Sequence, residues 1–218
     1  MGINVAIDGP AGAGKSTIAK KVAKKRNFIY VDTGAMYRAV AYYMLKNNID
    51  GNDEALVALK ASEADVTIKY IDGEQVVFLN GENVNQYLRT EETGNMASLT
   101  SKNPAVRKRL TELQKKLAKE NDVVMDGRDI GTVVLPDANV KIYLTADPHV
   151  RAKRRFDELV SKGEKPDIDE IEKSIILRDK QDMERKISPL KKADDAILVD
   201  SSYMSIDEVA EKILSLIK

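Results

Sequence analysis

Cysteine is absent from this 218-residue chain, and histidine occurs once. Without cysteine there are no disulfides, no thiolate nucleophile and no cysteine metal site. No apolar run approaches the roughly 18 residues of a membrane-spanning helix. The 35 basic side chains balance 35 acidic ones, so no global field favours nucleic acid or an anionic membrane. We therefore expect neither as a partner.

The length allows one sizeable core, or one core with an insertion. The N-terminus leads directly into a predicted strand, so we expect no secretory signal peptide. Ala6 stands where a myristoylation motif requires Ser or Thr. Balanced charge and the lack of an obvious apolar surface stripe favour a monomer. These features indicate a soluble cytoplasmic protein.

The most informative segment is GPAGAGKST, which matches the G-x-x-x-x-G-K-[ST] pattern of a phosphate-binding loop, or P-loop. An apolar run, Ile3 to Asp8, precedes it and predicts a buried strand, and apolar residues at helical spacing follow it. Glycines let successive N–H groups point into one concavity at a helix N-terminus. A chance match in a structural turn is disfavoured, because strand, loop and helix stand in register. The predicted phosphate-binding residues are Gly9, Pro10, Ala11, Gly12, Ala13, Gly14, Lys15, Ser16 and Thr17.

Within this loop, Lys15 is expected to reach the outer phosphates of a nucleoside triphosphate and the Ser16 hydroxyl to hold Mg²⁺. A second metal ligand is predicted at Asp126, where an apolar strand ends in a carboxylate. Arg128 and Asp129 then follow in a loop near the phosphates. A plain Asp-Gly turn is the alternative for this segment.

Short β-branched runs alternate with longer amphipathic stretches, which predicts an α/β fold. We expect a doubly wound five-stranded parallel sheet with ligands at the C-terminal ends of its strands. The predicted strands are Asn4–Ile7, Phe28–Val31, Val123–Met125, Val140–Leu144 and Ala196–Val199. The predicted helices are Lys15–Lys25, Ala35–Lys46, Ala105–Lys119, Val150–Ser161, Ile168–Ile187 and Ile206–Ile217.

One region breaks the alternation. The segment from Asp65 to Asn83 contains VTIKYIDGEQVVFLNGEN, two strands with Asp-Gly and Asn-Gly turns that tolerate positive φ. We predict an inserted small antiparallel domain over residues 63–101, with the core over 1–62 and 102–218. The insertion serves as a substrate-binding flap or is a surface excursion without function.

Arginine is scarcer than lysine, 11 against 24, and its planar guanidinium suits bidentate phosphate contacts. Thr33 and Arg38 follow the second strand and are candidates for a second phosphate or a base, although Thr33 also suits a helix cap and Arg38 a solvent-facing position. On the predicted helix Ile168–Ile187, one face carries Ile171, Ile175, Arg178, Asp182 and Arg185. This face points charged groups at a polar ligand, or else Arg178 and Asp182 form a surface pair.

A helical lid is predicted at about residues 149–166, where basic residues precede a Gly/Pro hinge. Arg151, Arg154 and Arg155 are its candidate phosphate ligands, without assigned roles. We interpret His149, which follows a proline at a helix start, as a structural surface residue.

With these residues placed, the chain closely resembles the bacterial cytidylate kinases over essentially its whole length. The resemblance is carried by IDGPAGAGKST, DTGAMYR, GRDIGTVV with PDA following, and RDKQDMERKISPLKKADDAI. It implies an ATP-binding core, an insertion that binds the nucleoside monophosphate, and a lid. It also implies transfer of the γ-phosphoryl group of ATP to CMP or dCMP, with Mg²⁺.

Carried over by position, the resemblance assigns cytosine recognition to Thr33, Arg107 and Asp129, and the monophosphate clamp to Arg38 and Arg128. Many relatives have Ser at the position of Thr33, and both residues offer a hydroxyl. Ribose contacts fall on Ser98, Arg178 and Asp182, and Arg185 joins the phosphate-neutralising set. The catalytic charges are thus Lys15, Arg128, Arg178 and Arg185.

Other functions remain open from the residues alone. A P-loop kinase for AMP, dTMP or a small metabolite such as shikimate is the nearest alternative, although the hairpin and the arginine set exceed what a small acceptor needs. A GTP-hydrolysing switch is disfavoured because the Asn-Lys-x-Asp pattern is absent. A non-catalytic ATP sensor is disfavoured by the presence of Lys15, Ser16 and Asp126.

Overall fold

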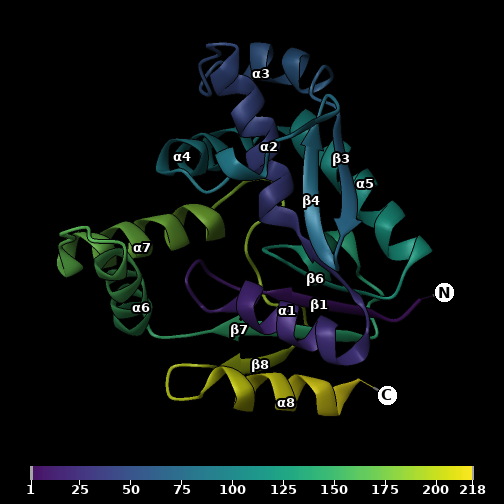
Figure 1. Cartoon of the computed structure of the whole chain (residues 1–218), viewed down its shortest axis with the longest axis vertical. Helices are drawn as coiled ribbons and strands as arrows, with labels where there is room; N and C mark the ends of the chain where they lie inside the picture. The colour runs from purple at the N-terminus through teal and green to yellow at the C-terminus, as the bar shows by residue number, and fades with distance from the viewer. Residues whose placement is uncertain (1, 218) are drawn as a thin grey trace. The chain divides into compact units, whose positions relative to one another are not determined.

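The structure, a computed structural model, describes residues 2–217. The chain forms two compact units (Figure 1). The first unit is Ile29–Asn121, and the second joins Gly2–Phe28 to residues 122–217. Each unit has its own core: Met36, Met44 and Leu110 are buried in the first, and Ile7, Met125, Ile142 and Ile213 in the second.

The second unit carries the P-loop and most of the larger sheet. Its elements are β1 (Asn4–Asp8), α1 (Lys15–Arg26), β6 (Val123–Gly127), the π-helical turn η2 (Ile130–Val134), β7 (Val140–Thr145), α6 (Pro148–Ser161), α7 (Ile168–Met183), β8 (Ile197–Asp200) and α8 (Ile206–Leu216).

The larger sheet has the strand order β2-β6-β1-β7-β8, and its edge strand β2 (Ile29–Asp32) belongs to the first unit. β1 runs parallel to both β6 and β7, and β7 runs parallel to β8. Val5 and Ile7 are fully buried, as expected of parallel strands covered on both faces. Asp8 aligns with Gly127 on one side and Tyr143 on the other, so these strand ends meet at one edge.

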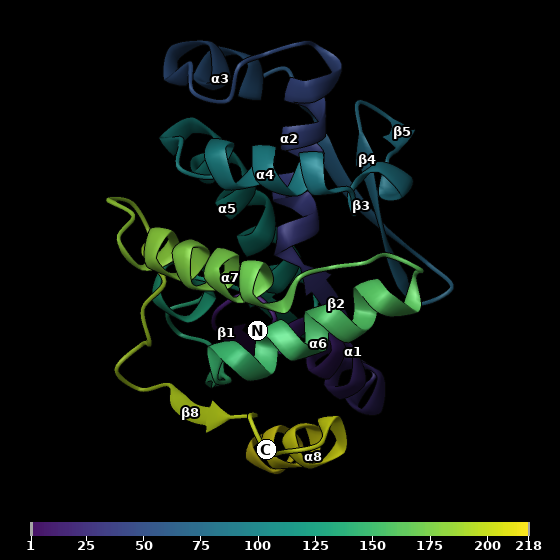
Figure 2. The same cartoon turned by 90° about the vertical axis from the view of Figure 1, so that its left-hand side faces the viewer.

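Helices complete the second unit. α1 packs on β1, β6 and α8, where the exposed ion pairs Lys21–Asp207 and Lys25–Glu211 join the two helices. α6 and α7 lie side by side (Figure 2). The turn between them contains Gly163, whose φ of 83° favours glycine.

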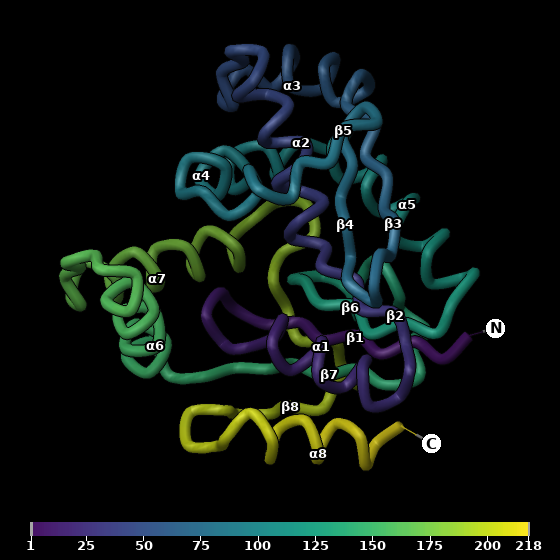
Figure 3. The backbone as a smooth tube through the Cα atoms, viewed as in Figure 1, coloured from purple at the N-terminus to yellow at the C-terminus, as the bar shows by residue number. Residues whose placement is uncertain are grey.

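The first unit combines helices with a small antiparallel sheet. Besides β2, its elements are α2 (Thr33–Lys46), α3 (Glu54–Ala61), β3 (Val66–Ile71), β4 (Glu74–Leu79), β5 (Glu82–Asn83), the 3₁₀ turn η1 (Asn85–Tyr87), α4 (Glu91–Thr100) and α5 (Pro104–Glu120). α2 packs against α4 and against β4 of the hairpin, whose course Figure 3 traces.

The predicted hairpin is confirmed. β3 and β4 pair antiparallel from Val66↔Leu79 to Ile71↔Glu74, and β5 adds a short third strand. Both residues of each turn have positive φ, 52° and 79° at Asp72-Gly73 and 49° and 83° at Asn80-Gly81. This is the geometry that Asp-Gly and Asn-Gly sequences favour.

The predicted α/β fold with a five-stranded parallel sheet is confirmed, and every predicted core strand is present. The prediction that the helix from Ile168 continues to Ile187 is wrong: α7 ends at Met183. The backbone N–H of Leu190 donates to the carbonyl of Asp182 at 2.8 Å, and Ser188 adopts a φ of 48°. Pro189 also disfavours a helical conformation at Ser188.

Two further differences concern the first unit. α3 and α4 were not predicted, and the compact unit includes β2, α2 and α5 in addition to the 63–101 segment. The assignment of monophosphate binding to residues 63–101 alone stays a prediction. Among residues 2–217, every helix is too short or too polar to span a lipid bilayer.

Candidate active site

The P-loop connects β1 to α1 and is shaped by its glycines. Gly9 has a φ of 148°, and a Cβ at this position would lie 1.9 Å from the carbonyl oxygen of Leu144 on β7. No side chain fits there without separating the two strands. Gly14, with a φ of 87°, precedes α1 and accepts the first helical hydrogen bond from Ile18 at 3.1 Å. The loop therefore opens onto a helix N-terminus, which favours anions.

Lys15 is 6% exposed, and its Nζ donates to the carbonyl oxygen of Pro10 at 2.6 Å. Burial lowers the pKa of Lys15 to about 7, with a further contribution from Arg128. Asp126, Asp8 and Asp182 oppose that shift. A phosphate group would add negative charge beside the ammonium and restore its charged form.

The two predicted metal ligands lie together. Ser16 Oγ donates to Asp126 Oδ2 at 3.0 Å, and Asp126 is 5% exposed at the end of β6. Hydroxyl and carboxylate oxygens suit Mg²⁺, which takes few protein ligands and completes its shell with water and phosphate. Within residues 2–217 no three His, Asp or Glu side chains cluster to hold a metal by themselves. The donor set fits a cation that arrives with a nucleotide.

Several charges of the second unit converge on Asp182 of α7. Arg128 Nε donates to Asp182 Oδ2 at 2.8 Å, and Arg185 Nη1 lies 3.7 Å from Asp182 Oδ1. Burial opposes ionisation of Asp182, but the guanidinium groups of Arg128, Arg185 and Arg178 outweigh it and lower its pKa. Burial, and then Arg128, lowers the pKa of Arg178. Three arginines thus surround one carboxylate.

The predicted charged face of α7 is confirmed in part. Arg178 and Asp182 lie on the helix, but Arg185 lies beyond its last residue and reaches Asp182 from the following turn. Its Nη2 donates to the carbonyl of Ser188 at 2.8 Å. The interpretation of Arg178 and Asp182 as a mere surface pair is wrong, since Asp182 is 13% exposed and bonds to Arg128 instead.

In the first unit, Thr33 is buried at the start of α2, but the helix cap is Asp32, whose carboxylate accepts from Ala35 N at 2.9 Å. The capping alternative for Thr33 is therefore wrong. A Cβ on Gly34 would lie 3.1 Å from Arg38 Nη1, which places that guanidinium beside the helix N-terminus.

The other first-unit candidates lie on α4 and α5. Arg107, 4% exposed, lies over the ring of Tyr37 at 5.4 Å and donates to the carbonyl of Ser101 at 3.1 Å. Ser98 is half-buried on α4. Arg107 and Thr33 are buried polar groups of the kind that a recognition site uses.

The predicted lid residues differ sharply from one another. Arg151 is 3% exposed: its Nη1 donates to the P-loop carbonyl of Ala11 at 2.9 Å and its Nη2 to Asp179 Oδ2 at 2.6 Å. Arg154 donates to the carbonyl of Ser201 at 2.7 Å. Arg155 forms an exposed pair with Glu158. The position of a lid over residues 149–166 stays a prediction.

His149 is exposed, as a surface residue should be, and its Nδ1 lies 2.8 Å from Glu172 Oε2. It therefore joins the start of α6 to α7. This contact is consistent with the structural role predicted for His149.

Sequence reasoning missed several supporting residues. Ser201, 2% exposed, donates to the carbonyls of Ala13 and Thr145, and Asp8 accepts from two backbone N–H groups beyond β6. In the first unit, Gln75 at the hairpin bonds to both the N–H and the carbonyl of Asp32. Only the position of Asp8 directly before the P-loop carried a signal in the sequence.

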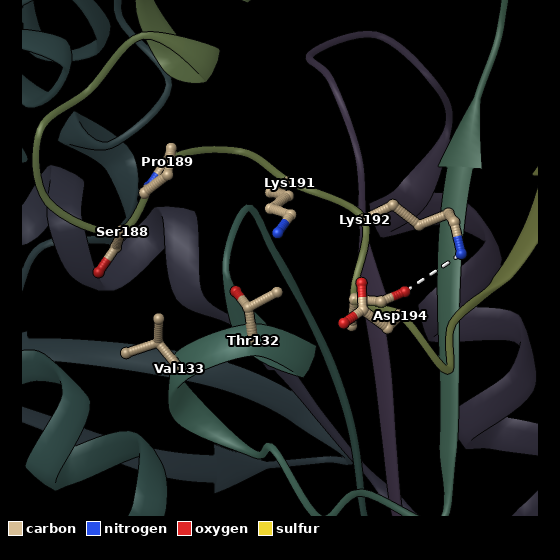
Figure 4. Close-up of a pocket in the computed structure, with 8 residues that line it drawn as sticks. Thr132, Val133, Ser188, Pro189, Lys191, Lys192 and Asp194 are labelled. Atoms are coloured by element: carbon tan, nitrogen blue, oxygen red, sulfur yellow. Dashed lines mark hydrogen bonds between the residues drawn. The ribbon is translucent and has the colours of Figure 1, made fainter.

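A pocket of about 390 Å³ lies between the turn η2 and the segment 188–194 (Figure 4). None of the predicted site residues lines it, although two wall residues bond to them: Val133 N donates to the Asp129 carbonyl and Ser188 accepts from Arg185. The lining residues are Thr132, Val133, Ser188, Pro189, Lys191, Lys192, Ala193 and Asp194.

The sequence model of the family described as cytidylate kinase matches residues 5–218. The chain belongs to the cytidylate kinase family. A protein of Bacillus licheniformis named cytidylate kinase is 52% identical over 215 residues, which cover 98% of this chain and 95% of that protein. The cytidylate kinase of Listeria monocytogenes is 53% identical with the same coverage. That of Caldicellulosiruptor bescii is 51% identical over 214 residues, also 98% and 95% of the two chains.

A solved structure of low identity shares the fold of this cytidylate kinase family member. An uncharacterised protein from Eubacterium ventriosum superposes with a TM-score of 0.56 at 15% identity, covering 99% of this chain and 98% of that one. A shikimate kinase from Bacteroides thetaiotaomicron gives a TM-score of 0.49 at 13% identity, with 98% and 97% coverage. At such identities the likeness bears on the fold alone.

Proposed function

We propose that the chain is an ATP-dependent CMP and dCMP kinase, which transfers the γ-phosphoryl group of ATP to the monophosphate and releases ADP with CDP or dCDP. The observation that carries the proposal is the surplus of positive charge at Arg128, Arg178 and Arg185 around Asp182, in the same unit as a complete P-loop. Membership of the cytidylate kinase family supports the acceptor.

The ATP side rests on the P-loop residues Gly9 to Thr17. Their backbone N–H groups and the N-terminus of α1 bind the phosphates, and Lys15 leaves the carbonyl of Pro10 to contact them. Ser16 and Asp126 would hold Mg²⁺, and the bound ion would neutralise charge on the phosphate oxygens.

Each unit carries residues that are assigned to the acceptor. The first unit contributes Thr33, Arg38, Ser98 and Arg107, and the second contributes Arg128, Asp129, Arg178, Asp182 and Arg185. Arg38 and Arg128 clamp the monophosphate, while Ser98, Arg178 and Asp182 bind ribose. The arginines stabilise the charge that develops during transfer, so little acid–base chemistry is needed.

Base recognition is assigned to Thr33, Arg107 and Asp129. The carboxylate of Asp129 accepts from the exocyclic amine of cytosine, as acidic side chains do in DNA readout. Uracil has a carbonyl at that position, so UMP is expected to be the poorer substrate. The burial of all three side chains supports this role, because a dry site makes each polar mismatch costly.

The decisive experiment measures ADP formation from ATP·Mg²⁺ with CMP, dCMP, UMP, AMP, dTMP and shikimate offered separately. We expect strong turnover with CMP and dCMP and much less with UMP. Preference for another acceptor would still be consistent with a P-loop phosphotransferase, but it would contradict the assignment of Thr33, Arg107 and Asp129 to cytosine recognition. ADP release at one slow rate with every acceptor would overturn the kinase itself.

Two variants separate the roles. Arg128→Ala is expected to lower kcat by orders of magnitude with ATP affinity nearly intact, because the phosphate clamp and the partner of Asp182 are lost. Unchanged turnover would remove Arg128 from the clamp.

Asp129→Ala is expected to reduce the ratio of kcat/KM for CMP to that for UMP by about 10-fold or more. An equal ratio in both proteins would end the base-reading role.

The proposal includes a cytoplasmic monomer without nucleic-acid or membrane partners. Nucleotide substrates of this kind are intracellular, and the balanced charge gives no general attraction to polyanions. Sedimentation of the free and nucleotide-bound protein tests the oligomeric state, and a dimer in either form would contradict it.

A further inference from the structure

Asp8 is the last residue of β1 and stands directly before the P-loop, but phosphate binding does not use its carboxylate. The side chain is buried, with 4% of the residue exposed. Both of its oxygens accept short hydrogen bonds from consecutive backbone groups beyond β6: Oδ1 from Ile130 N at 2.8 Å and Oδ2 from Gly131 N at 2.7 Å. A carboxylate bound at both oxygens fixes the position and the orientation of the backbone that it holds.

The backbone held by Asp8 begins immediately after Arg128 and Asp129. The carbonyl of Asp129 in turn accepts from Val133 N at 2.9 Å and from Val134 N at 3.2 Å, which closes the π-helical turn η2. Asp129 therefore stands at the junction between the two bonds to Asp8 and the turn. A shift of Ile130 would move Asp129 with it.

A second side chain, Lys141, also approaches this backbone. A Cβ on Gly131 would lie 3.3 Å from Lys141 Cδ and 3.4 Å from Asp8 Oδ2. Lys141 comes from β7, and its buried ammonium bonds to the carbonyl of Pro136 at the far end of this segment and to Asp195 Oδ2 at 2.7 Å. The segment 128–136 is thus held from two neighbouring strands, with Gly131 between Asp8 and the stem of Lys141.

We propose that Asp8 is a positioning residue for acceptor recognition: by holding Ile130 N and Gly131 N, it sets the place of Arg128 and Asp129. The proposal rests on the roles proposed above for those two residues. A purely structural role explains Asp8 poorly. Burial raises the pKa of Asp8 to about 6, which means that ionising this carboxyl in the folded protein costs stability. An apolar side chain at this position would avoid that cost.

The charges around Asp8 come from several elements. Asp129 raises its pKa and Lys15 lowers it, after the larger effects of burial and of the two backbone bonds. Tyr143 on β7 also interacts with it electrostatically. Because Lys15 belongs to the ATP site, the experiment must separate an effect on acceptor recognition from an effect on ATP.

The test compares Asp8→Asn with the unchanged protein by steady-state kinetics with CMP and UMP at saturating ATP. Asn keeps the size of the side chain but offers one acceptor oxygen, so one of the two backbone N–H groups loses its partner. We expect kcat/KM for CMP to fall about 10- to 100-fold. The ratio of kcat/KM for CMP to that for UMP should fall about 10-fold, while KM for ATP changes less than about two-fold.

Asp122→Asn is the matched control. Asp122 Oδ1 accepts from Ile3 N at 2.6 Å, the same kind of bond at the opposite end of β1, but on an exposed residue. This variant is expected to keep both the CMP/UMP ratio and KM for ATP. A comparable loss of the ratio in Asp122→Asn would show that any loosening of β1 suffices, and the positioning role of Asp8 would fall.

Two other results would overturn the proposal. One is an unchanged CMP/UMP ratio in Asp8→Asn. The other is a rise in KM for ATP as large as the loss toward CMP, which would mean that Asp8 acts through Lys15. Asp129→Ala, measured in parallel, separates this proposal from the proposed function. If the CMP/UMP ratio of kcat/KM falls in Asp129→Ala but not in Asp8→Asn, the base-reading role of Asp129 stands and the positioning role of Asp8 fails. If the ratio does not fall in Asp129→Ala, the base-reading role itself fails.

If Asp8→Asn does not fold, Gly131→Ala tests the same contact from the other side. Its new Cβ would lie 3.4 Å from Asp8 Oδ2, in ordinary contact, and 3.3 Å from Lys141 Cδ, so the lysine stem or the segment must shift by a few tenths of an ångström. A folded Gly131→Ala protein, judged by circular dichroism, is expected to lose CMP/UMP discrimination with KM for ATP unchanged. Full discrimination in that protein would overturn the proposal.

Discussion

Among single side chains, Lys15 shows how the P-loop accommodates a buried amine. Its ammonium bonds to the Pro10 carbonyl inside its own loop, and burial brings its pKa to about 7. A lysine with that pKa is mostly neutral at a pH of about 8. The triphosphate supplies the negative charge that returns the amine to its charged form.

ATP binding at about pH 8 is therefore expected to take up close to one proton, because the nucleotide phosphates are already fully ionised there. Isothermal titration calorimetry in two buffers of different ionisation enthalpy measures this uptake. Lys15→Met should bind ATP more weakly and without the uptake. Identical binding enthalpies of the unchanged protein in the two buffers would contradict the lowered pKa of Lys15.

Asp8 gives a second prediction, on stability. Burial raises its pKa from 3.8 to about 6 in the folded protein. A carboxyl whose folded-state pKa is the higher one favours folding when protonated, and that contribution is lost as the pH rises from about 4 to about 6. Removal of the carboxyl should therefore help more at high pH than at low pH.

We expect the free energy of unfolding of Asp8→Asn, relative to the unchanged protein, to rise by about 2 kcal/mol between pH values of about 4.5 and 7.5. Urea denaturation of both proteins at each pH measures the difference. Asp8→Ala should show the same pH dependence from a lower starting value, because only the carboxyl titrates. A difference that stays constant with pH would contradict the raised pKa.

Of the helices, α6 is joined to the P-loop by one side chain. Arg151 donates to Ala11 of the loop, to Ala146 before the helix and to Asp179 of α7. Both ionic partners are mostly buried, with side-chain exposures of 3% and 13%. Removing one partner of such a pair leaves the other charge uncompensated, which typically costs about 3 to 5 kcal/mol.

Arg151→Met is expected to lower the free energy of unfolding by about 3 kcal/mol, because the methionine keeps the stem but leaves Asp179 without its guanidinium. Arg155→Met on the same helix is the control. Arg155 pairs with Glu158 in an exposed i,i+3 contact, so its loss should change stability by less than about 0.5 kcal/mol. Urea denaturation of the two variants measures both free energies of unfolding. Equal values would mean that the buried pair contributes no more to stability than the surface pair.

The sequence predicted those elements whose pattern is local. All five core strands were found because buried parallel strands are continuous apolar runs, and the hairpin because its turns need positive φ. α3 and α4 were missed for physical reasons. α3 has only eight residues, and α4 contains Gly94 among Ser, Thr and Asn, so neither shows a strong helical period. The structure shows Asp53 and Thr90 capping these two helices.

The candidate site divides in the same way. The P-loop, Asp126 and the arginines carry their chemistry in short motifs, and the sequence suffices to name them. Asp8, Arg151, Ser201 and Gln75 bond to backbone groups up to 188 residues away, so only the tertiary structure reveals these bonds. Residues that belong to short motifs can thus be proposed from the sequence, whereas the bonds that hold such residues in place cannot.

For the chain taken as a whole, the contacts divide into two units, and the P-loop with its supporting residues belongs to one of them. Ser201 and Arg151 both bond to P-loop carbonyls from segments far along the chain. A ligand that orders the loop should therefore also reduce local opening at the start of α6 and at the start of the segment after β8. At 100 times its Kd, such a ligand stabilises the folded state by about 2.7 kcal/mol.

Hydrogen exchange with mass spectrometry tests this expectation. ATP·Mg²⁺ without a monophosphate should slow amide exchange in Ala11–Thr17 and also in the peptides that contain Arg151 and Ser201. In Arg151→Met the loop should still be protected, but the effect on α6 should be lost. Protection confined to the loop in the unchanged protein would contradict the coupling.

The lowered pKa of Lys15 also has a consequence for chemical labelling. With a pKa of about 7, the amine of Lys15 is neutral in roughly half of the molecules at neutral pH, whereas an ordinary lysine is neutral in roughly one of a few thousand. A neutral amine is the nucleophilic form. An electrophile attached to adenosine is therefore expected to label Lys15 in preference to the other 23 of the 24 lysines, because Lys15 lies in the proposed ATP site and a far larger fraction of its amine is neutral.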